Sequence, residues 1–182
     1  MPVLRSSNLS EIIGALLPRV AAATGLDPSR VALYAGDPED CPHFGGEQDV
    51  LFCVGEESSG GLEDGCGRYC DLRRQSLEVA VRTRLFLDAP NSDYRSLTSA
   101  TRGHLALRDV VYDCLQLWLV EVASTQPGAR QGDMDGVSMP SVTGSWSRPR
   151  KSRASKQSEG WAVSSLTLTV PYQRTLTLPE VS

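Results

Sequence analysis

The chain has 182 residues, of which 40% are hydrophobic and 22% are charged. This balance fits one globular domain with sizeable loops, and we expect a single domain over 1–182. Charges interrupt the apolar stretches well before the length of a membrane span, and Met1 to Ser10 lacks the pattern of a secretory signal. The formal net charge of −4 argues against a surface that binds nucleic acid throughout.

The first half of the chain predicts a helix followed by two strands. The helix has an apolar stripe at helical spacing and ends at Gly25. Residues 31–34 and 49–54 are apolar runs of strand length, separated by a loop over 36–48 and followed by a second loop over 55–67. The stripe consists of Leu9, Ile12, Ile13, Leu16, Leu17, Val20 and Ala21.

The second half begins with a long strand over 76–88, in which apolar and polar residues alternate and one face is expected to be buried. We expect it to pair with 49–54 as a hairpin. A second helix, from Leu97 or Gly103 to Val122, is apolar on more than one side, and a closing strand follows at 161–172. This order predicts an α+β fold: a mixed, mostly antiparallel sheet with two helices packed on one face, plus a long irregular arm over 124–160.

The sequence offers little for metal or catalytic chemistry. Possible zinc ligands occur in two loops, but the one-residue spacing of the first pair is poor for structural zinc, so we expect neither a metal nor a cofactor. They are Cys41, His43, Cys66 and Cys70. Cys53 and Cys114 lie in apolar runs and are expected to be buried, whereas His104 is expected to cap a helix or to lie on the surface. No nucleophile elbow or phosphate loop is present, and the acids cluster in predicted loops rather than in pairs on one rigid element with a nearby base, so we expect no enzyme.

Charge is distributed unevenly along the chain. Nine acidic residues and no basic ones occur from Asp37 to Asp64, and a group of basic residues without acids occurs from 148 to 156. Both segments are solvated surfaces in one interpretation; in another, the basic segment of one copy contacts the acidic loops of a neighbour or of a different partner. Contact with nucleic-acid phosphates is a further alternative.

The acidic residues expected to contact a neighbour or to face a channel are Glu47, Asp49, Glu56, Glu57, Glu63 and Asp64. The expected partner contacts of the arm are Arg148, Arg150, Lys151, Arg153, Lys156, Trp146 and Trp161, although Trp161 has the equally good alternative of closing the core edge.

Several features follow one another over residues 8–122 and 160–176. They are the N-terminal amphipathic helix, the strand from Asp49 to Val54, Gly67-Arg68-Tyr69 at the end of a glycine-rich stretch, Arg82-Thr83-Arg84 in the long strand, Gly103-His104-Leu105-Ala106-Leu107 at the second helix, and Gly160-Trp161 before a strand that ends at Tyr172. In this order and at this size, they resemble the small tail-terminator, or tail-completion, proteins of tailed bacteriophages. The arm at 124–160 is longer than this pattern and matches nothing in it.

The resemblance implies a structural virion protein of the tail or neck, assembled in the host cytoplasm. Such proteins form a ring, usually a hexamer, that caps the tail tube, ends tube growth and joins the tail to the head connector. DNA passes the lumen without specific binding. A head-closure or head–tail adaptor protein is the alternative within the same class. A cytosolic binding module that uses the basic segment 148–156, or a zinc-dependent enzyme that uses the loop cysteines, is the alternative from other classes.

Overall fold

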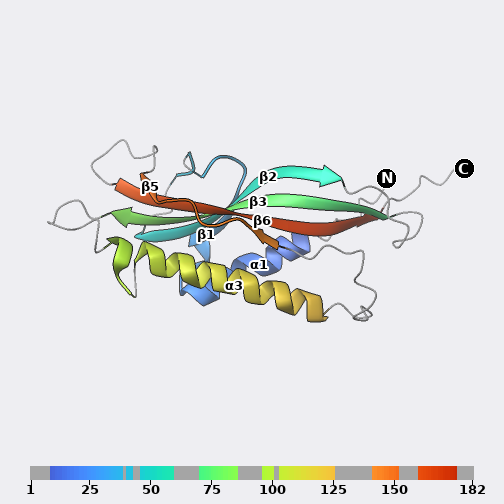
Figure 1. Ribbon diagram of the computed structural model, residues 1–182, viewed down its shortest axis with the longest axis horizontal. Coiled ribbons are helices and arrows are strands. Elements are labelled where there is room, and N and C mark those ends of the chain that lie inside the picture. Colours follow the sequence, from blue (N-terminus) through green and yellow to red (C-terminus); the bar gives the residue numbers. More distant parts are fainter. Residues whose placement is uncertain are drawn as a thin grey trace, which may run out of the picture.

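The computed structural model describes residues 9–38, 40–42, 46–59, 70–85, 96–100, 103–125, 141–151 and 160–175. Helices cover one face of a six-stranded sheet whose strand order is β1-β2-β3-β6-β4, with β5 also paired to β6 (Figure 1). The helical elements are α1 (Leu9–Thr24), the 3-10 helix η1 (Pro28–Arg30) and α3 (His104–Thr125). The strands are β1 (Val31–Tyr34), β2 (Gln48–Ser59), β3 (Cys70–Leu85), β4 (Ser141–Thr143), β5 (Arg150–Lys151) and β6 (Gly160–Thr175).

The topology confirms the predicted α+β class. β1 pairs with β2 in parallel, and the other strand pairs are antiparallel. β2 and β3 form the expected hairpin, and β6 returns beside β3 over the whole length of both strands. α1 and α3 pack against each other on the same side of the sheet (Figure 1).

Helix α1 has the predicted bounds because its apolar stripe faces the sheet. Leu16 and Val20 are fully buried, and the hydroxyl of Thr24 donates to the Val20 carbonyl at 2.7 Å, which satisfies one of the carbonyls left open at the helix end. Gly25 then adopts a φ of 69°, the left-handed conformation that terminates helices and that glycine enters without strain.

The main core lies between the two helices and the sheet. Alternate residues of the central strands point into it, among them Phe52, Val79 and Leu168, and α3 contributes Val111 and Leu115. This is the face that the period-two pattern of the long strand predicts to be buried. The opposite face of the sheet was expected to be exposed, but near its middle it is buried as well, around Ala80 and Arg82.

The hairpin of β2 and β3 is longer than the sequence predicts. Residues 55–59, expected to form a loop, continue β2, and β3 begins at Cys70 rather than at residue 76. A bulge between Val54 and Glu57 shifts the register of the pair. The Gln75 amide donates to the Gly55 carbonyl at 2.9 Å, so one side chain satisfies a backbone group that the bulge leaves unpaired.

Beyond the bulge, the three central strands form a polar extension of the sheet, defined here as residues 55–59, 70–75 and 171–175. The side chains of Glu56, Glu57, Ser58 and Arg74 on it are exposed. Figure 1 shows this end of the sheet reaching past the helical layer.

Part of the segment predicted as an irregular arm belongs to the sheet. Residues 124 and 125 complete α3, and β4 and β5 pair with β6 along its outer edge. Between them, Ser147 accepts a hydrogen bond from the Ser165 amide through its hydroxyl and donates its own amide to the Ser165 carbonyl. The two strands are short and separated by glycine and proline, so no period-two pattern marks them in the sequence.

Candidate functional site

Asp49, expected to contact a neighbour or face a channel, is buried inside the protein. Only 2% of Asp49 and none of Arg82 is exposed. The two residues lie opposite each other in the register of β2 and β3, and the guanidinium donates to both carboxylate oxygens, at 2.5 and 2.7 Å. Because this bidentate ion pair uses both oxygens of Asp49, the expectation of an intermolecular role for Asp49 is wrong.

The same guanidinium attaches the loop over 36–48 to the face of the sheet that lies opposite the helices. Arg82 donates to the carbonyl oxygens of Cys41 at 2.6 Å and of Pro42 at 3.1 Å. A small apolar cluster lies beneath this loop: Cys41, Leu51, Cys53, Ala80 and Val163. Arg82 therefore has a structural role, although the alternation of the long strand places it on the expected polar face.

The remaining acidic residues do not form one surface. Glu47 is exposed just before β2, whereas Glu56 and Glu57 lie on the extension, toward the other end of that strand. Glu57 forms an ion pair with Arg73 of β3. Glu63 and Asp64 lie outside the described residues. The acidic stretch in the sequence is thus divided in space, because a strand separates its members.

The basic segment starts on the sheet edge. Arg148 is exposed, Arg150 and Lys151 form β5, and Arg153 and Lys156 lie outside the described residues. Trp161 was expected as a partner contact, but only 5% of it is exposed. It lies in β6, opposite Arg84 of β3, where the protein's own fold covers it.

Trp146 anchors the segment between β4 and β5 to the body of the protein. The half-buried indole packs against the main core, and the Arg108 guanidinium carbon lies 5.3 Å from the centre of its ring. A cation at this distance is attracted by the face of the ring. The buried indole nitrogen and the Arg108 Nε have no hydrogen-bond partner within the part of the chain that the structure describes.

Trp146→Ala is expected to loosen this anchor, with a loss of about 1–2 kcal/mol in the free energy of unfolding from apolar burial and the cation–π contact. The exchange of the Ser147 and Ser165 amide hydrogens, measured by NMR, should accelerate more than that of amides in β2. The exposed Arg148 serves as a matched control, since Arg148→Ala should leave both amides protected. Unchanged protection in Trp146→Ala would contradict the anchoring role.

His104 is buried, contrary to the expectation of a cap or surface residue. It is the first residue of α3, and its ring contacts two neighbouring strands, with Nδ1 3.1 Å from the Thr83 hydroxyl of β3 and Nε2 2.9 Å from the Ser164 hydroxyl of β6. Burial, with a smaller contribution from the charge of Arg108, lowers the pKa of His104 to about 4. The ring is therefore neutral near pH 7 and ties α3 to both strands.

The described thiols have the character of core residues. Cys53 and Cys114 are buried as predicted, and Cys41 is buried with them. Burial raises the pKa of Cys53 to about 12, so its thiol stays protonated at neutral pH.

No group of three or more potential metal ligands occurs among the described residues. His43 and Cys66 lie outside those residues, so the predicted absence of a metal stays a prediction.

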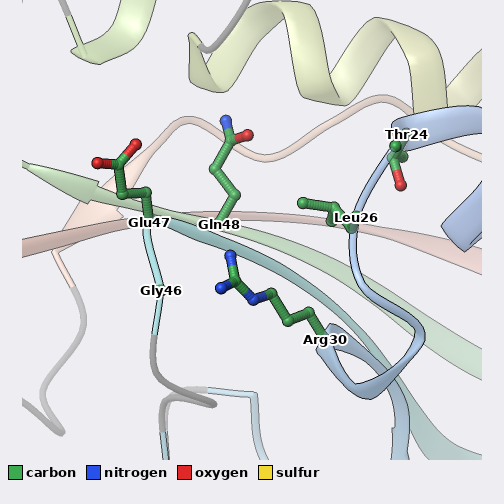
Figure 2. A pocket seen from close by; sticks show the side chains of 7 residues that line it. Thr24, Leu26, Arg30, Gly46, Glu47 and Gln48 are labelled. Atoms are coloured by element: carbon green, nitrogen blue, oxygen red, sulfur yellow. The ribbon is translucent and has the colours of Figure 1, made fainter.

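A polar hollow of about 510 Å³ lies at the end of the sheet where β1 and β2 begin. Its lining consists of Thr24, Gly25, Leu26, Arg30, Gly46, Glu47 and Gln48. Figure 2 shows Arg30 reaching from η1 toward the backbone at Gly46, while the carboxylate of Glu47 points away from it. A Cβ atom at Gly46 would lie 2.3 Å from the Arg30 guanidinium carbon, so the close approach requires glycine there. No pattern in the sequence indicates this hollow, because its lining residues come from three separate turns.

Comparison with protein families and with curated proteins identifies no relative. No protein-family model matches the chain, and no curated protein matches its sequence. No helix within the described ranges combines the length and apolarity needed to cross a membrane. What the fold defines is a class: an α+β protein with a mixed sheet and one helical layer.

Proposed function

We propose that this chain is a structural virion protein that forms a ring, a hexamer in the family it resembles, on the end of a phage tail tube. The ring stops tube growth and joins the tail to the head connector, and DNA passes its lumen without specific binding. In this role the protein works by self-assembly, without catalysis, in the tail or neck of the particle.

The observation that carries the proposal is the polar extension of the sheet beyond the helical layer (Figure 1). The exposed polar side chains at this end of the strands, those of Glu56, Glu57, Ser58 and Arg74, contribute little to the core. They are suited to contact a neighbouring copy or the tube across surfaces of complementary charge.

The outer surface of α3 also supports an assembled state. Leu105, Val110 and Tyr112 are 40%, 39% and 36% exposed, and Asp109 and Asp113 lie among them. Exposed apolar side chains gathered on one helix surface are suited to cover by a neighbouring subunit, with the acidic residues at the polar rim of such a contact. In a ring, each copy offers two different surfaces to its two neighbours, so a chain with several distinct contact features fits that arrangement.

The proposal is tested by adding the purified protein to the tail tube protein of the same phage during polymerisation. We expect shorter tubes, each with ring-shaped density at one end in electron micrographs, and a closed ring in native mass spectra. Heat-unfolded protein serves as the control and should leave tube length unchanged. Tubes of unchanged length with bare ends would overturn the proposal.

A further inference from the structure

We propose that the hollow around Arg30 is a carboxylate-binding site, and that its ligand is the side chain of Glu56 from an adjacent copy of this chain. The inference rests on the proposed ring and names one contact within it.

The Arg30 guanidinium is available for a ligand. It is half-buried, and no carboxylate of the described residues forms an ion pair with it. The nearby Asp27 accepts hydrogen bonds from the Ser29 amide at 2.9 Å and the Ser29 hydroxyl at 2.6 Å, and these lower the pKa of Asp27 more than the charge of Arg30 does. The planar fork of an arginine that lies against a glycine backbone presents paired N–H donors, the arrangement that binds a carboxylate through two hydrogen bonds.

The shape and lining of the hollow limit its ligand. About 510 Å³ holds a side chain or a small molecule rather than a helix. Its other charged residue, Glu47, directs its carboxylate away from Arg30 (Figure 2). The hydroxyl proton of Thr24 is donated to the Val20 carbonyl, and Arg30 is the cationic donor that the lining offers to an anion.

Glu56 is the partner that the fold favours. Its side chain is exposed on the polar extension, and its neighbour Glu57 is already paired with Arg73. From Glu47, at the hollow, to Glu56 the strand advances by about 30 Å, so one copy cannot bring Glu56 to its own Arg30. A contact between opposite ends of β2 in two copies joins unlike surfaces, which is the kind of interface that closes into a ring.

Charge reversal at both sites tests the contact. Arg30→Glu and Glu56→Arg should each weaken self-association by about tenfold, the effect of losing one hydrogen-bonded charge pair, in sedimentation velocity and in capping of tubes. A one-to-one mixture of the two variants should regain association, because every interface in an alternating ring is then complementary. Recovery in the mixture also shows that both variants are folded.

Two further variants sharpen the result. Gly46→Ala keeps every charge but displaces the guanidinium, and it should weaken association as Arg30→Glu does. Asp40→Arg reverses an exposed acid on the loop over 36–48 and should change nothing. If the wild type forms rings and Arg30→Glu does so equally well, or if the mixture fails to recover, the assigned contact is wrong and the proposed function stands. A wild type that neither associates nor caps tubes overturns both.

Discussion

Asp49→Ala is expected to lower the free energy of unfolding by about 3–5 kcal/mol, because it leaves a buried guanidinium without its counter-charge. Arg82 has no exposed surface, and its guanidinium donates to both carboxylate oxygens of Asp49. Chemical denaturation at neutral pH measures the loss. Glu47→Ala removes an exposed acid two residues earlier and should cost less than about 1 kcal/mol. A similarly small loss in Asp49→Ala would show that water reaches Arg82.

The double variant Asp49→Leu with Arg82→Met separates the ion pair from the loop contacts. Apolar residues of similar size often replace a buried pair without loss of stability. Here the carbonyl oxygens of Cys41 and Pro42 would also lose their donor, so we expect only partial recovery. Proteolysis within the loop over 36–48 should therefore stay faster than in the wild type.

Acid is expected to destabilise the protein through His104. Its pKa is about 4 in the folded state, against an ordinary value of 6.5, so the unfolded chain binds the proton more readily. The stabilisation that the neutral His104 ring provides is fully present above pH 6.5 and is lost as the pH falls toward 4. At pH 4.5 the loss amounts to about 2.5 kcal/mol relative to pH 7.

His104→Gln tests this contribution, because glutamine cannot take up the proton. Denaturant unfolding at pH 7 and at pH 4.5 should show a difference that is smaller in His104→Gln than in the wild type by about 2.5 kcal/mol. His43 remains in both proteins and contributes equally. Identical pH dependence in the two proteins would contradict the neutral, buried state of His104.

The main helices and strands of this fold are predictable because the spacing of apolar residues indicates which side chains face the core. The stripe of α1 and the alternation around Val79 gave the two layers and the hairpin correctly. β4 and β5 were missed, since three and two residues are too few for a periodic signal. The extension was missed because glycine and charge at residues 55–57 suggest a loop, whereas after the bulge Glu57 to Ser59 pair with β3 and continue the strand.

The buried polar residues were mispredicted for a common reason. Arg82 and His104 are polar types that usually lie on surfaces, and their burial depends on partners that are distant in sequence. One signal was present for Arg82: once β2 and β3 are taken as a hairpin, an acid at the start of an apolar strand can face an arginine in its partner. The hollow at Arg30 had no comparable signal, because three turns combine to form it only in the folded chain.

The polar extension begins at the bulge that the Gln75 side chain stabilises. A bulge bends and twists the strand that carries it, and here the side-chain amide at residue 75 fixes that bend through the Gly55 carbonyl. The direction of the extension is therefore set by a few residues that lie apart from the helical layer. Substitutions at these positions can change the direction of the extension, so that its end meets a neighbouring molecule at a different distance or angle. The packing of the sheet against the helices is kept.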